Sequence, residues 1–162
     1  MSGAAKLIWR GVHKRFSGPP VLAGMDLDVA RGRSLVLIGG SGQGKSVTIK
    51  LALGLLRPDA GEVLLDGVNV AALSADERAG MFGKVGMLFQ GGALFSTLTV
   101  AENIMVPLRE FYPELSPRLL DEIARFKVAL SGLPDSAADK YPSELSGGMR
   151  KRAGIARALA LD

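Results

Sequence analysis

The sequence has no cysteine and only one histidine, His13, among its 162 residues. Disulfide bonds, cysteine-bound metals and histidine metal clusters are therefore excluded. No apolar run approaches the roughly 18 residues that a membrane-spanning helix needs. Residues 1–16 also lack the apolar stretch of a signal peptide. These absences favour a protein of the reducing cytoplasm.

The charge balance is mildly basic, with 20 Lys and Arg, 16 Asp and Glu, and a formal net charge of +4. Such a surplus of positive charge is compatible with a nucleic-acid partner or an anionic membrane surface, and it also occurs in proteins that have no charged partner. The basic residues are scattered apart from a cluster at residues 150–152, and no nucleic-acid recognition motif accompanies them. We therefore expect no nucleic-acid partner.

The most informative segment that is present is GGSGQGKS, which fits the pattern G-x-x-x-x-G-K-[ST]. The apolar run 34–38 before it predicts a buried parallel strand, and residues 45–56 after it predict a helix. Glycines let successive backbone N–H groups converge on a phosphate, and the helix adds its positive N-terminal end. The sequence therefore predicts a polyphosphate-binding loop made of Gly39, Gly40, Ser41, Gly42, Gln43, Gly44, Lys45 and Ser46.

Four side chains are candidates for chemistry around that loop. Lys45 supplies a mobile cation for the terminal phosphates, and Ser46 supplies a hydroxyl for Mg²⁺. Phe16 ends an early strand, where an aromatic ring either packs in the core or stacks on a base. Gln90 follows a second predicted buried strand, residues 85–89, where its amide either caps the strand or reaches a metal ion and a water.

A second glycine-rich segment, LSGGM at residues 145–149, opens a basic helix-like run. Ser146, Gly147 and Gly148 place exposed N–H groups ahead of a helix, which predicts either an anion site or an ordinary helix start in a surface loop. The chain has only one phosphate loop with a lysine, so a second anion site would have no use within a single copy. A two-fold dimer would use it by pairing each loop with the LSGGM segment of the other copy.

The remaining patterns predict an α/β fold with an antiparallel N-terminal β part and a helical insert. Strands are expected at 7–16 and 25–29 around a turn at 17–20, and at 62–65 before a hairpin turn at Asp66-Gly67. Helix starts are expected at Ser74, Thr99 and Ser116. An apolar stripe predicts the buried face of the third helix, namely Leu119, Ile123, Phe126 and Leu130. We divide the chain into residues 1–96, a helical part 97–145 and a final helix 146–162.

With residues 39–46, Gln90 and residues 145–149 in place, the whole chain resembles the nucleotide-binding domain of ATP-binding cassette (ABC) transporters. The resemblance implies a P-loop ATPase fold, ATP and Mg²⁺ as cofactors, and ATP hydrolysis coupled to transport. It implies that Phe16 stacks on adenine and that Gln90 joins Lys45 in catalysis and Ser46 in metal binding. Val47 departs from the family, in which a threonine is usual, so one phosphate contact should be lost.

The same resemblance implies that Ser146, Gly147 and Gly148 contact the γ-phosphate across a dimer. The stretches Phe89–Glu110 and Glu144–Asp162 are more particularly similar to the ATPase subunit of MCE-type (Mla-like) lipid transporters of Gram-negative bacteria. This implies phospholipid transport and a position on the cytoplasmic face of the inner membrane. The implied partners are a second copy, a transmembrane permease and an MCE-type lipid-binding protein.

In the family, a strand ending in the Walker B aspartate and catalytic glutamate follows the helix after LSGGM, and a switch histidine comes later. These residues do not follow within the 162 residues. We therefore expect an N-terminal portion of an ATPase that by itself binds ATP weakly and hydrolyses it at or near background. Two rivals are a DNA-repair type of ABC ATPase and a non-catalytic nucleotide-binding or interaction module.

Overall fold

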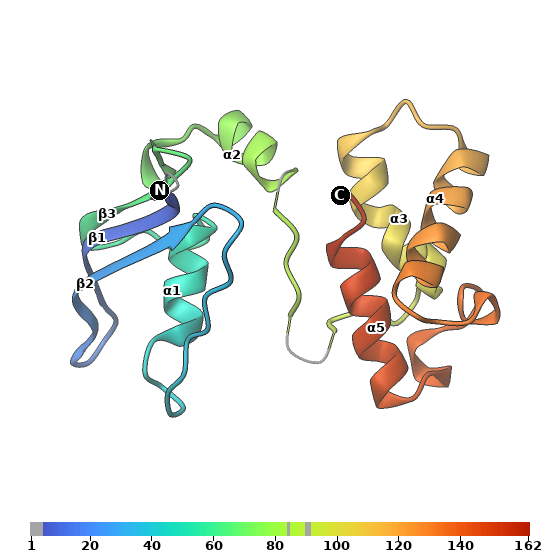
Figure 1. Ribbon diagram of the computed structural model, residues 1–162, viewed down its shortest axis with the longest axis horizontal. Helices are drawn as coiled ribbons and strands as arrows, with labels where there is room; N and C mark the ends of the chain where they lie inside the picture. The colour runs from blue at the N-terminus through green and yellow to red at the C-terminus, as the bar shows by residue number, and fades with distance from the viewer. Residues whose placement is uncertain (1–4, 84, 90–91) are drawn as a thin grey trace. The chain divides into compact units, whose positions relative to one another are not determined.

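A computed structural model describes residues 5–83, 85–89 and 92–162. The chain forms two compact units, Met1–Ala79 and Gly80–Asp162 (Figure 1). The first unit combines a sheet with a helix, and the second is helical. The functional division at residues 96 and 145 stays a prediction.

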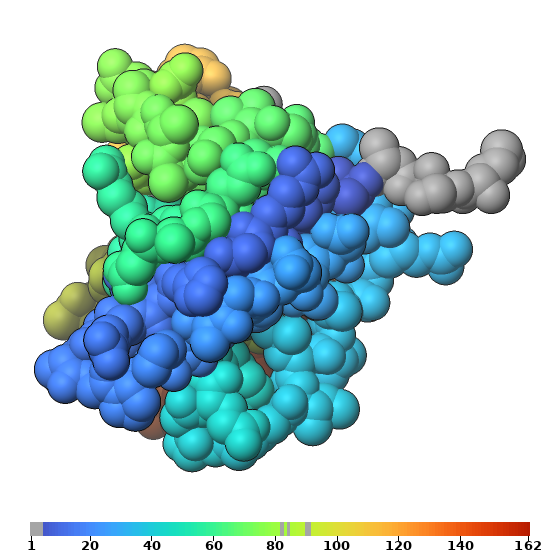
Figure 2. Space-filling view, turned by 90° about the vertical axis from the view of Figure 1, so that its left-hand side faces the viewer, coloured from blue at the N-terminus to red at the C-terminus, as the bar shows by residue number. Residues whose placement is uncertain are grey.

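The first unit is organised by one antiparallel sheet with the strand order β2-β1-β3-β4. Its strands are β1 (Ala5–Arg15), β2 (Pro20–Ala30), β3 (Ala60–Leu65) and β4 (Val68–Asn69). Figure 2 shows β2, β1 and β3 running side by side. Asp66 and Gly67 turn from β3 into β4 with φ of 49° and 79°, the left-handed conformation that a two-residue hairpin turn requires. The predicted hairpin turn at Asp66-Gly67 is therefore confirmed.

Helix α1 (Lys45–Ala52) packs on the sheet and buries Leu51 against it. The indole Nε1–H of Trp9 donates to the Thr48 carbonyl at 3.2 Å, and Trp9 is only 4% exposed. Leu53 and Val63 are also buried in this unit. The start of α1 is thereby fixed relative to β1.

A bulge in β1 makes this packing possible. Side chains of a regular strand alternate between the faces, so Trp9 and Val12 would point to opposite sides. The pairing register shifts with β2 between Trp9 and Val12 and with β3 between Arg10 and His13. Gly11 takes φ +54°, and its N–H donates to Asp26 Oδ1 at 2.7 Å. The extra residue changes the alternation, and both Trp9 and Val12 are buried.

Two predicted strands are absent from the structure. Residues 34–38 and 85–89 have no regular strand conformation, and Val36 and Ile38 are 75% and 91% exposed. A buried parallel strand exists only when neighbouring strands satisfy its backbone and cover its faces. Among the described residues no strand pairs with either segment, so the prediction of two buried strands is wrong for this structure.

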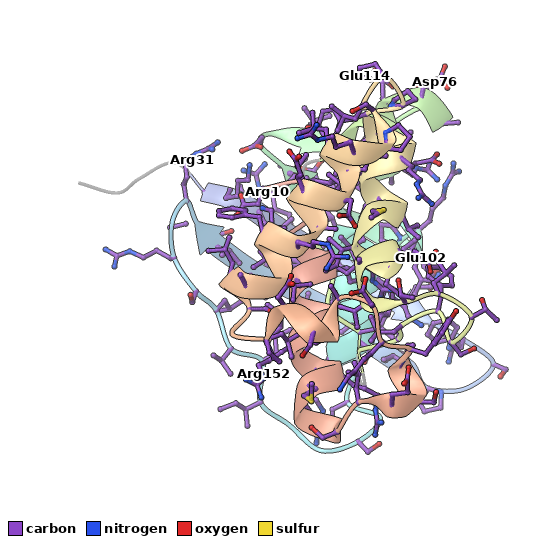
Figure 3. The ribbon with its side chains drawn as sticks, turned by 90° about the vertical axis from the view of Figure 1, so that its right-hand side faces the viewer. Arg10, Arg31, Asp76, Glu102, Glu114 and Arg152 are labelled. Carbon is purple, nitrogen blue, oxygen red and sulfur yellow. The ribbon has the colours of Figure 1, made fainter. Side chains whose placement is uncertain are left out.

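The helix starts predicted from capping patterns are confirmed. Helix α2 (Ala75–Phe82) follows Ser74, whose N–H and hydroxyl donate to the Glu77 carboxylate. A capping box of Thr99 and Glu102 opens α3 (Val100–Phe111). Ser116 caps α4 (Pro117–Leu130) and accepts from the Leu119 N–H at 3.3 Å. In Figure 3, Glu102 lies at the start of α3 and Glu114 in its connection to α4.

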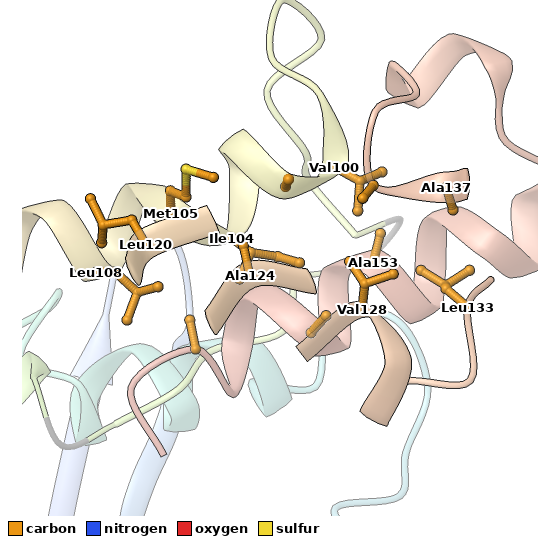
Figure 4. Close-up of a cluster of buried hydrophobic side chains, with 14 of the residues drawn as sticks. Val100, Ile104, Met105, Leu108, Leu120, Ala124, Val128, Leu133, Ala137 and Ala153 are labelled. Atoms are coloured by element: carbon orange, nitrogen blue, oxygen red, sulfur yellow. The ribbon is translucent and has the colours of Figure 1, made fainter. Parts of the chain in front are cut away.

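The second unit packs α3 and α4 against α5 (Gly147–Ala158) around a continuous apolar core (Figure 4). Short 3₁₀ turns at Asp135–Ala137 and Pro142–Glu144 connect α4 to α5. The core-facing residues of α4 are small or branched, and they are Leu120, Ala124 and Val128.

The predicted apolar stripe of α4 is therefore on the wrong face. Leu119, Phe126 and Leu130 are 42%, 60% and 65% exposed, and Ile123 is half-buried. The adjacent stripe is buried because Ala124, with no exposed area, lets the neighbouring helices approach closely. Arg125 pairs with Asp139, beyond the end of α4, at 2.7 Å, which favours this rotation of the helix. Its second pair, with Asp121 at 2.9 Å, lies within α4 and holds the Arg125 side chain in place.

Replacement of Gly61 by alanine should destabilise the first unit far more than the same change at Gly67. Both glycines have φ +79°, but a Cβ at Gly61 would lie 2.2 Å from the Gly11 carbonyl oxygen, whereas a Cβ at Gly67 meets nothing within 4 Å. We expect Gly61→Ala to lower the free energy of unfolding by about 2–5 kcal/mol, and Gly67→Ala by about 1–2 kcal/mol. Urea denaturation measures both, and equal losses would contradict the backbone contact at the bulge.

Candidate functional site

The segment Gly39–Ser46, here called the glycine loop, connects the irregular residues 34–38 to the start of α1. Gly44 precedes the helix with φ +82°, and a Cβ there would lie 3.0–3.2 Å from atoms of Val21 and Leu22. The Thr48 hydroxyl donates to the Gly44 carbonyl at 3.0 Å. The end of the glycine loop is therefore held between β2 and α1.

Two side chains fold back over the glycine loop. The Lys45 ammonium donates to the Gly39 carbonyl at 2.7 Å and to the Gly40 carbonyl. The Gln43 side-chain oxygen accepts the Gly40 N–H at 2.8 Å. Residues 39–43 are otherwise exposed, as is Ser46, and Val47 is half-buried. The structure thus brings residues 39–46 together as one loop that is exposed apart from the buried Gly44 and the half-buried Lys45.

The electrostatics of the loop favour an anion. The first turn of α1 contains no acidic residue, so nothing there neutralises the positive helix end. Lys45 adds a full positive charge beside it. A phosphate could accept hydrogen bonds from the loop backbone and displace the lysine from the Gly39 and Gly40 carbonyls.

Phe16, the candidate base platform, is an exposed residue at the end of β1. It is 51% exposed, so it does not pack in the core. The Lys14 ammonium lies 5.6 Å from the centre of its ring and donates to Asp59 at 2.7 Å. The hydrogen bond from Lys14 lowers the pKa of Asp59, and a second bond from the Arg15 N–H acts in the same direction. The ring has exposed area on which a base could stack.

The second glycine-rich segment forms the start of α5. The Ser146 hydroxyl accepts from the Met149 N–H at 3.3 Å, and Leu145 is buried beneath it. Arg150 donates to the Leu145 carbonyl at 2.6 Å. Ser146, Gly147 and Gly148 are all exposed, and a Cβ at Gly148 meets nothing within 4 Å. These three residues belong to the second unit and the glycine loop to the first.

Gln90 lies outside the described residues, but the chain on either side of it is held against α5 by close backbone contacts. A Cβ at Gly86 would lie 1.9 Å from the Ala158 carbonyl oxygen, and a Cβ at Gly154 would lie 2.9 Å from the Gly92 Cα. Arg157 donates to the Gly92 and Ala93 carbonyls at 3.1 Å and 2.9 Å. Burial lowers the pKa of this guanidinium.

Sequence analysis missed Asn103, a fully buried polar residue in α3. Its side-chain oxygen accepts the Phe95 N–H at 2.7 Å, and its side-chain amide donates to the carbonyls of Phe95, Leu98 and Thr99. Asn103 therefore fixes the shape of residues 95–99. An asparagine on the buried face of an amphipathic helix was the available signal, since such a residue needs partners.

The second unit also contains an apolar cavity of about 570 Å³. Val85, Gly86 and Phe89 contribute to its lining, and so do Phe95, Val106, Pro107 and Phe111. The Arg157 guanidinium lies 5.7 Å from the centre of the Phe95 ring at this cavity. The cavity thus presents aromatic and aliphatic surface with one cation, Arg157, and one carboxylate, Glu110.

Metal binding by protein groups alone has no support in the part of the chain described. No cluster of three or more His, Asp or Glu side chains is placed there to hold an ion. Mg²⁺ commonly binds through few protein groups plus substrate phosphates and waters. The exposed Ser46 hydroxyl at the glycine loop fits that mode. Over the described residues, no helix has the length and apolarity to cross a membrane.

Comparison with known proteins places this geometry in a family. A family model described as ABC transporter matches residues 22–162. The "Probable ribonucleotide transport ATP-binding protein mkl" of Mycobacterium leprae (strain TN) is 42% identical over 153 residues, which are 94% of this chain and 44% of that protein. The "Intermembrane phospholipid transport system ATP-binding protein MlaF" of Escherichia coli (strain K12) is 42% identical over 138 residues, 85% of this chain and 51% of that protein.

The structure also resembles solved ATP-binding cassettes. One is the dimeric structure of a post-hydrolysis state bound to ADP and Pi, with a TM-score of 0.86, 29% identity, and coverage of 95% of this chain and 69% of that chain. This likeness confirms the predicted α/β fold class. The chain spans about half the length of the curated relatives named above.

Proposed function

The chain belongs to the ABC transporter family, and on that premise we propose that it forms the nucleotide-binding part of an ATPase subunit that drives phospholipid transport. The observation that carries the proposal is the glycine loop at the start of α1, with Lys45 folded across it. ATP hydrolysis, the transported molecule and the partners concern the whole protein and are parts of this proposal.

The residues of the glycine loop fit Mg²⁺ and ATP. Backbone N–H groups of residues 40–44 and the N-terminal end of α1 bind the phosphates, and Lys45 moves from the Gly39 and Gly40 carbonyls to a phosphate oxygen. The Ser46 hydroxyl is positioned to hold the metal ion, and Phe16 to stack on the base. Bound ATP would supply the phosphoryl group that is transferred to water, and Mg²⁺ held at Ser46 would offset the negative charge of the phosphates. Gln90 is assigned to metal and water by the family pattern.

We propose that the start of α5 completes the site of a second copy. Ser146, Gly147 and Gly148 are exposed, and the first turn of α5 has no acidic residue. A helix end of this kind attracts phosphate. A two-fold dimer would give each glycine loop the α5 start of the other copy, so closure would require nucleotide.

The cavity beside Phe95 is proposed as the docking place of a permease segment. Its apolar lining suits a short helix or loop of a membrane protein. Hydrogen bonds from Asn103 and Arg157 hold the surrounding residues 92–99 in a fixed conformation. A rigid surface of this kind can transmit movement to a docked partner. The similarity of residues 89–110 to MCE-type lipid transporter ATPases supports this occupant. Such contact would place the subunit on the cytoplasmic face of the inner membrane.

A nucleic-acid function has less support. Arg150 and Arg152 donate to the Leu145 and Gly132 carbonyls at 2.6 Å and 2.9 Å. These arginines of the basic cluster therefore stabilise the connections that precede and flank α5. Their engagement with the protein backbone leaves less of the cluster to neutralise phosphates of a DNA backbone.

Replacement of Lys45 by alanine should weaken nucleotide binding by about 10- to 100-fold, since a hydrogen bond between charged groups is lost. Lys50 is the matched control, because it is an exposed lysine of the same helix. Calorimetric titration of the protein as the cell makes it with MgADP measures both. An unchanged affinity of Lys45→Ala would remove the glycine loop from the binding site.

Replacement of Gly148 by leucine should abolish nucleotide-dependent dimerisation and leave the fold intact. The added side chain enters open space in the monomer but would obstruct a partner that approaches the start of α5. Ala129→Leu, at an exposed position of α4, is the control. Sedimentation with and without a non-hydrolysable ATP analogue distinguishes them. A dimer of normal affinity for Gly148→Leu would exclude this interface.

The relatives' names differ on cargo, since one specifies ribonucleotide and the other phospholipid. If lipid is the cargo, phospholipid vesicles should raise the ATP turnover of the complex purified with its permease by at least about two-fold. The reason is that bound lipid would shift the complex toward the conformation that hydrolyses ATP. Ribonucleotides should leave turnover unchanged. The reverse pattern would assign the ribonucleotide function instead.

A further inference from the structure

We propose that Lys14 is a positioning residue, which holds the Phe16 ring in the orientation that receives the base of a nucleotide. The proposal rests on the proposed function, in which a base stacks on Phe16. The Lys14 ammonium lies 5.6 Å from the centre of the Phe16 ring, and a cation within about 6 Å is attracted to a ring face. A cation on one face leaves the opposite face for a base.

The backbone on either side of Phe16 is fixed by hydrogen bonds, whereas the ring is not fixed by packing. The Arg15 N–H donates to Asp59 Oδ2 at 2.6 Å, and the Arg15 side-chain Nε–H donates to the Gly18 carbonyl at 2.8 Å. The ring itself is 51% exposed, so no core selects its side-chain rotamer. The contact with Lys14 therefore favours one orientation of the ring.

Lys14 can act in this way because it is itself held in place. Its ammonium donates to Asp59 Oδ1 at 2.7 Å, and its side chain is only 14% exposed. The Asp59 N–H donates to the His13 carbonyl at 2.9 Å. Asp59 thus bonds to three consecutive residues of β1, from His13 to Arg15. A surface lysine without such a partner would lose more rotamer freedom on contact with the ring.

The ring also lies at the end of the sheet that holds the glycine loop. Arg15, next to Phe16, pairs with Pro20 across β1 and β2. The next residues of β2, Val21 and Leu22, are those that a Cβ at Gly44 would meet at 3.0–3.2 Å. A nucleotide whose phosphates bind the glycine loop would therefore have its base near this end of the sheet.

The test compares the affinities of the protein, as the cell makes it, for MgADP and for magnesium pyrophosphate by calorimetric titration. The ratio of the two affinities reports the part of the nucleotide beyond the phosphates, because attraction of Lys14 to phosphate acts on both ligands. Lys14→Met retains the chain length and removes the charge. The loss of the cation should lower the ratio by about 2- to 5-fold.

Three further variants show whether the effect passes through the ring. Lys14→Arg keeps a cation that can pair with Asp59 and should keep the ratio of wild type. Asp59→Asn leaves Lys14 in the chain but removes its charged partner, so the ratio should fall as in Lys14→Met. Lys6→Met is the matched control, because Lys6 pairs with Asp66 at the other end of β1, and it should leave the ratio unchanged.

Phe16→Ala separates the inference from the proposed function. Loss of base stacking should lower the ratio by at least about 5-fold. If Phe16→Ala lowers the ratio and Lys14→Met does not, or if Lys14→Met weakens both ligands equally, the inference is overturned while the stacking role of Phe16 stands. If Phe16→Ala leaves the ratio unchanged, or wild type binds neither ligand, the proposed function fails first and the inference fails with it.

Discussion

The hydrogen bond from the Trp9 indole to the Thr48 carbonyl connects the sheet of the first unit to α1. The position of the end of the glycine loop depends on this junction, because the loop ends where α1 begins. Trp9 and Val12 are both buried because β1 contains a bulge at Gly11. A local irregularity in one strand therefore helps to determine where the backbone of the glycine loop is held.

Local patterns in the sequence were sufficient for the turns, the caps and the loop itself. The Thr99 capping box and the Asp66-Gly67 turn depend on contacts within a few residues, so their outcome could be predicted. A strand at 34–38 could not be established in this way, because its existence depends on neighbours far along the chain. On α4, two adjacent apolar stripes were available, and packing around Ala124 decided between them.

The site follows the same division. Residues 39–43, Ser46 and Ser146 are exposed, and their binding roles stay predictions. The fold-back of Gln43 could not be read from a motif that treats its position as variable, since it depends on the course of the loop. Asn103 was recognisable in principle as a polar residue among apolar ones, but its partners at residues 95–99 required the three-dimensional arrangement.

Gly86 lies close to the backbone of α5, and Gly154 of α5 lies close to the backbone at Gly92. These contacts have a mechanical consequence. Where two backbones meet without side chains between them, no rotamer change can absorb a displacement. A tilt of α5 would therefore displace the backbone at Gly86 and Gly92 by nearly the same amount. Helix α5 and the segments on either side of Gln90 would therefore move together as one rigid body. The glycines that make this possible have no side chain to take part in binding or catalysis.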